Sequence, residues 1–448
     1  MGARTPLGTI DHAWLRMDRP TNPMMVTGVM TFDEPVDVHR LRRTIESRMS
    51  DGLDRFRQRV VERGPARRAV WEDVPDFRVA DHVDHRMLPQ PADRAILQAE
   101  IAKLVSTPIW PSDRPLWRMH LLENPNDGRA VLVTRLHHCI ADGFALMHVM
   151  LTLTDAEAEP PEPVAPPPHA HPSLGGRLRE AVSAALEARK QLDGRLAKKA
   201  VRAAGAVGGD LLHLAFLRNQ PETMLRGPLG HDKRVAWSAP MPLDEIKATG
   251  RALGGTVNDV LMTAAAGALR RYLAERGEDP SGFDLRTAVP VNLRSPAQMR
   301  ELGNYFGLVF LELPLGVEDP RARFVELKHR MDALKRSPEP YVLLNLMRVT
   351  GGGPRWLEEI VIRILGAKTT AVLTNVPGPR QPRYLAGQRI RTIMFWVPQS
   401  GRVGLGVSIF SYAGEVRLGV AVDAHLVREP ERIIEAFPDE LEALRASV

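Results

Sequence analysis

Two adjacent histidines, followed by an aspartate, are the side chains of this sequence best suited to chemistry. They lie in the run His137-His138-Cys139-Ile140-Ala141-Asp142-Gly143, which has the form HHxxxDG. A neutral histidine can remove the proton from a hydroxyl, amine or thiol as that group attacks a thioester. A carboxylate four residues beyond the second histidine can fix the loop that holds the ring. The spacing therefore predicts acyl transfer, and the structural alternative is a buried histidine pair with Asp142 capping the next helix.

The elements around this run must position the histidines. Residues 131–136 alternate in character and include β-branched side chains, which predicts a strand that ends at the histidines, and residues 144–150 look helical. Because side chains alternate along a strand, His137 and His138 point to opposite faces and only one of them can face a given cavity. For the same reason the two rings cannot easily share an ion, and we expect no metal site here.

Length and composition indicate a globular protein of more than one domain. The chain has 448 residues, of which 44% are hydrophobic and 25% charged. The single cysteine, Cys139, excludes an internal disulfide and fits a reducing compartment. The N-terminus has no apolar signal segment and no run is long enough to span a bilayer, so we expect a cytoplasmic protein.

The net charge of +6 has two interpretations: it reflects a generally basic proteome, or the protein has an anionic partner. The sequence contains no zinc-ligand spacing, RNA-binding signature or helix-turn-helix pattern, so we expect no nucleic acid. An anionic small molecule such as CoA and an acidic membrane surface remain as partners.

A proline-rich break divides the chain. Residues 158–172 contain seven prolines, and residues 174–220 are rich in Ala, Leu, Arg and Lys. Between Arg177 and Arg202 eight basic residues stand against three acidic ones, a net charge of +5. This helical stretch either lies on an anionic membrane or joins two domains with a solvated basic face. We predict lobes at 1–157 and 227–448, with a linker at 158–226.

The second half again alternates helices and strands. A helix is expected from about 256 to 276, with Thr256 and Asn258 as plausible N-cap residues. Strands are expected at 287–294 and 308–313, with another before the turn at 377–379. Three further strands, at 394–398, 403–408 and 416–422, are expected to close the second sheet.

Several stretches resemble the bacterial wax ester synthase/acyl-CoA:diacylglycerol acyltransferase family, and together they span nearly the whole chain. HHxxxDG alone is moderately specific, whereas the ordered set is highly specific. The set comprises Arg-Pro-Thr-Asn-Pro at 19–23, Pro-Leu-Trp at 115–117, HHxxxDG at 137–143, Val-Asn-Asp-Val at 257–260, Pro-Val-Asn-Leu-Arg at 290–294, Gly-Asn at 303–304 and Thr-Asn-Val-Pro-Gly-Pro at 374–379.

This resemblance implies a mixed α/β fold of two chloramphenicol-acetyltransferase-like lobes, with an active-site tunnel between them. It implies transfer of a fatty acyl group from acyl-CoA, as a substrate and without a cofactor, to the hydroxyl of diacylglycerol or of a long-chain alcohol. His138 would be the general base, and Gly143 would close the turn. The resemblance also implies that His137 and Asp142 are catalytic-site residues and that Thr374 or Asn375 is the oxyanion donor. Asn258 and Asp259 would lie near the acyl-CoA path, and Asn304 on the oxyanion or acyl-CoA side.

Condensation domains with the same signature pair this aspartate with an arginine. We therefore expect Asp142 to pair with Arg294, which ends a strand in the other half. The resemblance also implies peripheral attachment to the inner membrane or to lipid inclusions. Two alternatives remain open: an acyltransferase that acts on a glycolipid or a polyketide alcohol, and a non-catalytic lipid-binding protein with this fold.

Overall fold

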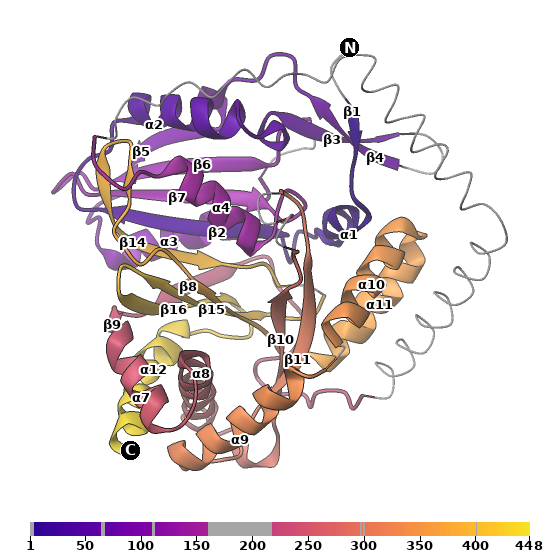
Figure 1. The fold of residues 1–448 in the computed structure, drawn as a ribbon, viewed down its shortest axis with the longest axis vertical. Helices are drawn as coiled ribbons and strands as arrows, with labels where there is room; N and C mark the ends of the chain where they lie inside the picture. The colour runs from indigo at the N-terminus through magenta and orange to yellow at the C-terminus, as the bar shows by residue number, and fades with distance from the viewer. Residues whose placement is uncertain are drawn as a thin grey trace. The chain divides into compact units, whose positions relative to one another are not determined.

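A computed structural model of the protein describes residues 4–63, 68–109, 113–159, 217–295, 298, 301–337, 339–399 and 401–448. Residues 4–158 and 218–448 form one compact unit, which contains two large sheets with their helices and one small sheet (Figure 1). The predicted mixed α/β class with two sheet-containing lobes is confirmed. Most of the proline-rich stretch and almost all of the basic stretch lie outside the described residues, and the domain boundaries remain a prediction.

The first sheet carries the histidines. Its strands, in spatial order, are β13 (Tyr384–Leu385), β14 (Gln388–Trp396), β2 (Met25–Phe32), β7 (Ala130–His137), β6 (Trp117–Glu123) and β5 (Val83–Met87). All neighbours are antiparallel except β5 and β6. The register of β2 and β7 sets Met25 opposite His137, so the histidine strand is a central strand supported on both sides.

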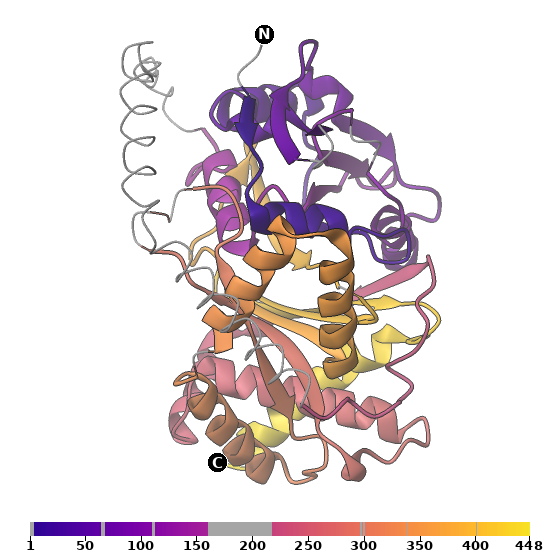
Figure 2. The ribbon, with the colours of Figure 1, turned by 90° about the vertical axis from the view of Figure 1, so that its right-hand side faces the viewer.

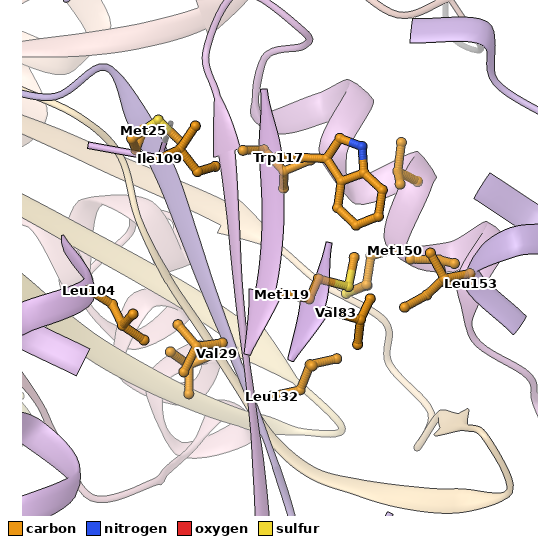
Figure 3. Packing of buried hydrophobic residues seen from close by; sticks show 14 of the residues in the cluster. Met25, Val29, Val83, Leu104, Ile109, Trp117, Met119, Leu132, Met150 and Leu153 are labelled. Carbon is orange, nitrogen blue, oxygen red and sulfur yellow. The ribbon is translucent and has the colours of Figure 1, made fainter. Parts of the chain in front are cut away.

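Apolar side chains of this sheet pack against helices on both faces. Helices α2 (Val38–Ile45) and α4 (Gly143–Leu153) cover one face, and α3 (Arg94–Ser106) covers the other. Figure 3 shows Leu104 and Val29 on one side of the strands, and Met119, Met150 and Leu153 on the other. The period-two alternation of the strands divides the core in this way.

The second sheet is also mixed. Its strands, in spatial order, are β11 (Phe306–Leu313), β10 (Leu285–Asn292), β12 (Ala371–Pro377), β15 (Leu405–Tyr412), β16 (Glu415–Asp423) and β8 (Lys233–Trp237), with β9 (Met241–Pro242) beside β16. The pairs β10–β12 and β12–β15 are parallel. The helices that accompany this sheet are α7 (Leu243–Ala252), α8 (Val257–Ala274), α9 (Pro320–Leu334), α10 (Glu339–Gly352), α11 (Arg355–Lys368) and α12 (Pro430–Ala446).

Strand β14 corrects one expectation. The sequence predicts that residues 394–398 close the second sheet, but β14 pairs with β2 of the first sheet, with Met394 opposite Val29 and Phe395 opposite Gly28. Alternating apolar residues specify a strand but not its neighbour, which is why the sequence pattern gave the element and missed its partner. The C-terminal half of the chain therefore contributes β14 to the first sheet.

A three-stranded sheet completes the N-terminal half, with β1 (Arg4–Pro6), β4 (Arg68–Asp73) and β3 (Gln58–Arg63). Strands β3 and β4 pair antiparallel. Helix α1 (Thr9–Met17) follows β1 and packs along α10, as both ribbon views show (Figures 1 and 2). Helix α1 thus joins the N-terminal half to the helices of the C-terminal half.

Candidate active site

The predicted strand–turn–helix around the histidines is present. Strand β7 ends at His137, and α4 begins at Gly143. The backbone N–H of His138 donates to the carbonyl of Met24 at 2.8 Å, and that of Ile140 donates to the carbonyl of His137 at 3.0 Å. These bonds fold the chain into a tight turn, so the orientation of His138 is set by backbone geometry.

The two histidine rings lie in different surroundings, as the strand alternation predicts. His138 lines a cavity, whereas His137 does not. His137 Nδ1 accepts a hydrogen bond from the N–H of Cys139 at 3.1 Å, and its Nε2 lies 3.9 Å from Asp18 Oδ2. Burial lowers the pKa of His137 to about 3, so this ring is neutral and supports the turn.

Two aromatic rings lie close to the ring of His138. The Trp14 ring stacks on it with centroids 4.0 Å apart and planes inclined by 13°, and Phe306 lies 5.7 Å away. Burial lowers the pKa of His138, and the nearby Asp142 carboxylate partly opposes that effect. A neutral imidazole at this position can accept a proton.

Asp142 has two structural roles. Its Oδ1 accepts a hydrogen bond from the N–H of Ala145 at 3.0 Å, which caps α4. Its Oδ2 accepts from Arg294 Nη1 at 3.1 Å and from the N–H of Tyr305 at 2.9 Å. The predicted ion pair is therefore present, and it is buried, with side-chain exposures of 5% for Asp142 and 0% for Arg294.

The loop at residues 303–305 holds the histidine turn from the C-terminal half. The carbonyl of Gly303 accepts from Arg294 Nη2 at 2.7 Å and from the N–H of Asp142 at 3.3 Å. Gly303 has a φ of +115°, a backbone conformation that residues with a Cβ rarely adopt. Asn304 Nδ2 donates to the carbonyl of His138 at 2.8 Å. The loop thus fixes both ends of the turn.

A second contact fixes the turn from the N-terminal half. Asp11 Oδ1 accepts from Asn304 Nδ2 at 2.8 Å, and its Oδ2 lies 3.1 Å from Arg55 Nη1. The same Arg55 nitrogen donates to the carbonyl of Ile140 at 2.7 Å. Burial raises the pKa of Asp11, and Arg55 opposes that effect. Asp11, Asn304 and Arg55 therefore connect α1 to both sides of the histidine turn.

The cavity beside His138 is mostly apolar. Its volume is about 130 Å³, and both halves of the chain line it. Phe144 comes from the N-terminal half, whereas Phe310 and Val372 come from the second sheet. A further apolar cavity of about 110 Å³ lies inside the first lobe, and it shares the wall residues Gly143, Val376 and Phe395 with the first cavity. Together these spaces suit hydrocarbon.

The two candidate oxyanion donors, Thr374 and Asn375, are neighbours on strand β12. Thr374 lies on the same face of the strand as Val372 and Val376, which line the cavity. Its buried hydroxyl has no hydrogen-bond partner among the described residues. Asn375 also borders the cavity, but its Nδ2 donates to Asn258 Oδ1 at 2.9 Å. Thr374 is therefore the better-placed donor.

The helix that begins after Gly255 gives the other predicted residues structural partners. Thr256 is the N-cap of α8, and Asp259 accepts its backbone N–H at 2.8 Å in a capping box. Asn258 lies in the first turn of α8 and contacts Asn375. Neither Asn258 nor Asp259 lines the cavity, and neither do Asn304, Arg294 and His137.

The sequence left some site residues unassigned. Trp14 and Phe306 contact the His138 ring, but an aromatic residue in an amphipathic helix or strand carries no signal that separates it from core packing. Trp117 of the Pro-Leu-Trp run is a core residue: it is fully buried and its Nε1 donates to the carbonyl of Phe56 at 2.7 Å.

Cys139 is unsuited to act as a nucleophile. It is buried, and burial raises the pKa of its thiol well above the usual value. Within the part of the chain that the structure describes, no three His, Cys, Asp or Glu side chains cluster closely enough to hold a metal ion. No helix of the described residues is both long and apolar enough to cross a membrane.

Two family models together match most of the chain. The model of the wax ester synthase/diacylglycerol acyltransferase catalytic domain matches residues 7–261, and that of the WS/DGAT C-terminal domain matches residues 302–445. The chain belongs to the wax ester synthase/diacylglycerol acyltransferase family, which is a family of acyltransferases.

Individual relatives and solved structures are similar to the chain over most of its length. A Mycobacterium tuberculosis protein described as a probable diacylglycerol O-acyltransferase, tgs2, is 28% identical over 467 residues and covers 98% of both chains. Another from the same species, tgs1, is 28% identical over 385 residues, 84% of this chain and 81% of that protein.

The wax ester synthase/diacylglycerol acyltransferase from Marinobacter aquaeolei superposes with a TM-score of 0.70 at 22% identity, over 99% of both chains. The first condensation domain of the calcium-dependent antibiotic synthetase gives 0.62 at 17% identity, over 99% of this chain and 96% of that domain. These two likenesses concern the fold.

Proposed function

We propose that the protein transfers a long-chain fatty acyl group from acyl-CoA to the hydroxyl of diacylglycerol, of a long-chain alcohol, or of both. The observation that carries this proposal is a neutral histidine, His138, on the wall of an apolar cavity at the meeting of the two lobes. Family membership and relatives described as diacylglycerol O-acyltransferases support the same substrates.

The proposed reaction needs one base and no acyl-enzyme. The imidazole of His138 takes the proton of the acceptor hydroxyl, and the acceptor oxygen bonds to the thioester carbonyl carbon. When the carbon–sulfur bond breaks, the CoA thiolate takes the proton back from His138, which leaves an ester and free CoA. In this proposal Thr374 donates a hydrogen bond to the oxyanion that forms between these steps, because it borders the cavity and its hydroxyl has no partner among the described residues.

The surrounding residues position the base. Trp14 fixes the plane of the His138 ring by stacking. Asn304 holds the backbone of His138, and the Asp142–Arg294 pair holds the turn that follows. We therefore assign Asp142, Arg294 and Asn304 as positioning residues rather than as proton carriers.

A transfer assay with labelled palmitoyl-CoA tests the proposal. Diacylglycerol, hexadecanol and a glycolipid are offered separately, and the products are separated by chromatography. We expect labelled ester from diacylglycerol, hexadecanol or both. Label on the glycolipid alone would move the proposal to the alternative acceptor, and no transfer to any acceptor would refute it.

Substitution of the base makes the assay specific. His138→Ala should lower the turnover rate by roughly 10²–10⁴-fold while the protein stays folded, because that is the usual contribution of a positioned base. His137→Ala should act mainly by lowering the melting temperature. His329→Ala, which changes an exposed histidine on α9, is the matched control. Wild-type turnover in His138→Ala would contradict the assignment.

A further inference from the structure

The outer face of the α10–α11 hairpin exposes large apolar side chains. Trp356 and Tyr341 are each 61% exposed, Ile360 is 42% exposed and Val349 is 40% exposed. They follow helical spacing, with Tyr341 and Val349 eight residues apart on α10, and Trp356 and Ile360 four apart on α11. Each pair therefore forms a stripe along its helix. Four of the nine large apolar residues that are exposed in the described chain lie on this hairpin.

The same outer faces are basic. Arg348, Arg355 and Arg363 are exposed, and the exposed carboxylate among them is Glu359, which bonds to Arg355 at 3.2 Å. Three arginines against one glutamate leave a net charge of +2 beside the apolar stripes. Tryptophan and tyrosine, with arginine nearby, are the side chains that favour the interface between lipid headgroups and hydrocarbon.

The inner face of the hairpin borders the active site. Leu343 and Met347 of α10 and Ile362 of α11 line an apolar cavity of about 40 Å³ beneath the helices. The other walls of this cavity include Trp14, Phe306, Leu308 and Leu365, and these four residues also line the cavity of His138. One layer of helix thus separates the exposed stripes from a space that adjoins the catalytic histidine.

The hairpin is anchored to the element that positions the base. His12 Nδ1 lies 3.2 Å from the carbonyl of Gly351, and Arg16 Nη1 donates to the carbonyl of Gly353 at 2.9 Å. A Cβ on Gly351 would stand 1.8 Å from the carbonyl oxygen of Thr9, so only glycine allows this close approach. Figure 2 looks onto the hairpin with α1 directly above it. The surface and Trp14 therefore belong to one packed unit.

We propose that the outer face of α10 and α11, formed by Tyr341, Val349, Trp356 and Ile360 with Arg348, Arg355 and Arg363, docks on an anionic lipid bilayer. Docking would bring the cavity beneath the hairpin to the membrane, so that the acceptor lipid passes from the bilayer toward His138 by way of this cavity, which shares four wall residues with the cavity of His138. The bilayer is the occupant because the stripes combine apolar and basic side chains and adjoin an apolar cavity. The passage of the acceptor rests on the proposed function; the docking does not.

Flotation with vesicles tests the docking directly. The full chain is mixed with vesicles of phosphatidylcholine alone, or with phosphatidylglycerol added, and the bound fraction is measured at low and high salt. We expect binding that increases with phosphatidylglycerol and weakens with salt. The double variant Trp356→Glu with Ile360→Glu should reduce binding at least tenfold. Val325→Glu is the matched control, because Val325 is also 61% exposed but lies on α9.

Activity assays separate this proposal from the proposed function. With diacylglycerol held in vesicles, the double variant should lose at least tenfold in kcat/KM, whereas with a short, water-soluble alcohol its kcat/KM should match that of the wild type. If no acceptor is acylated, the proposed function fails while flotation still decides the docking. Unchanged flotation of the double variant, or equal loss in Val325→Glu, would overturn the docking surface. A dimer that dissociates in the double variant without vesicle binding would overturn it in favour of self-association.

Discussion

Arg294→Met removes the arginine of the buried ion pair at the histidine turn. Methionine has a similar length but no charge and no N–H donors. The substitution leaves the Asp142 carboxylate buried, with the N–H groups of Ala145 and Tyr305 as its partners. It also removes the 2.7 Å hydrogen bond to the carbonyl of Gly303. Removing one partner of a buried ion pair destabilises a protein by roughly 3–5 kcal/mol, and we expect about 4 kcal/mol here.

The expected change in melting temperature follows from the size of the protein. Unfolding entropies of about 2.1 cal/mol/K per residue, applied to 448 residues, give roughly 0.9 kcal/mol/K in total. A loss of about 4 kcal/mol therefore lowers Tm by about 4 °C. Activity should fall together with Tm, because Gly303 and Asp142 lie in the loops that hold His138. Thermal melts and the palmitoyl-CoA assay, run on the same preparation, measure both quantities.

A double-mutant cycle identifies the interaction. Asp142→Asn and Arg294→Met are combined, and the coupling free energy should be about 0.5–3 kcal/mol. Asp423→Asn is the control, because Asp423 pairs with Lys233 at 2.8 Å in an equally buried position and neither residue lines the cavity of His138. It should lower Tm without changing turnover at temperatures where the protein is folded. Wild-type melting of Arg294→Met, or zero coupling, would refute the reasoning.

Four further outcomes are expected. Since burial lowers the pKa of His138, kcat/KM should stay constant above about pH 6.5 and fall only in more acidic buffer; an activity midpoint above that value would contradict it. Burial raises the pKa of Glu358 to about 7. The stability that proton binding to this carboxyl gives is complete below its unfolded pKa of about 4.5 and is lost as the pH rises through 7, a fall of about 3 kcal/mol. Glu358→Gln should flatten this fall in thermal melts measured across that pH range. Asn304→Leu removes the donor to Asp11 and to the carbonyl of His138, and it should destabilise by about 1–3 kcal/mol per lost bond in urea unfolding and reduce kcat. Cys139→Ser should retain turnover. An inactive but folded variant would instead favour a mechanism with an acyl-enzyme on Cys139.

Local sequence patterns predicted the elements around the site and some of its geometry. The alternation in residues 131–137 and the break at Asp142 are short-range signals, and they gave the strand, the turn and the divergence of His137 and His138. The Asp142–Arg294 pair joins residues 152 positions apart, and resemblance to condensation domains supplied it. No local pattern could have done so, because contact between distant loops depends on the packing of both lobes.

The site features that the sequence did not predict also depend on packing between distant segments of the chain. Trp14 stacks on His138 because α1 packs on the helices of the C-terminal half, which no periodicity within α1 specifies. The carboxylate of Asp259 was a candidate for the acyl-CoA side. A Thr–x–x–Asp spacing at a helix start is also the signature of a capping box, and Asp259 forms that capping box with Thr256. The exposed stripes of α10 and α11 have the spacing of ordinary amphipathic helices, and only the packing of the folded chain places a cavity against their inner faces.

The pairing of β14, from the C-terminal half, with β2 of the first sheet has a consequence for synthesis on the ribosome. Strand β2, Met25–Phe32, emerges early, but the strand that completes its outer side ends at Trp396. At roughly 5–20 residues per second, the roughly 260 residues from His137 to Trp396 take roughly 10–50 s to translate. During that interval β2 presents an unpaired edge, and such edges favour association with other chains. The nascent N-terminal half is therefore a natural client for chaperones, and expression of residues 1–157 alone should yield aggregates unless a peptide with the sequence of β14 is supplied in trans.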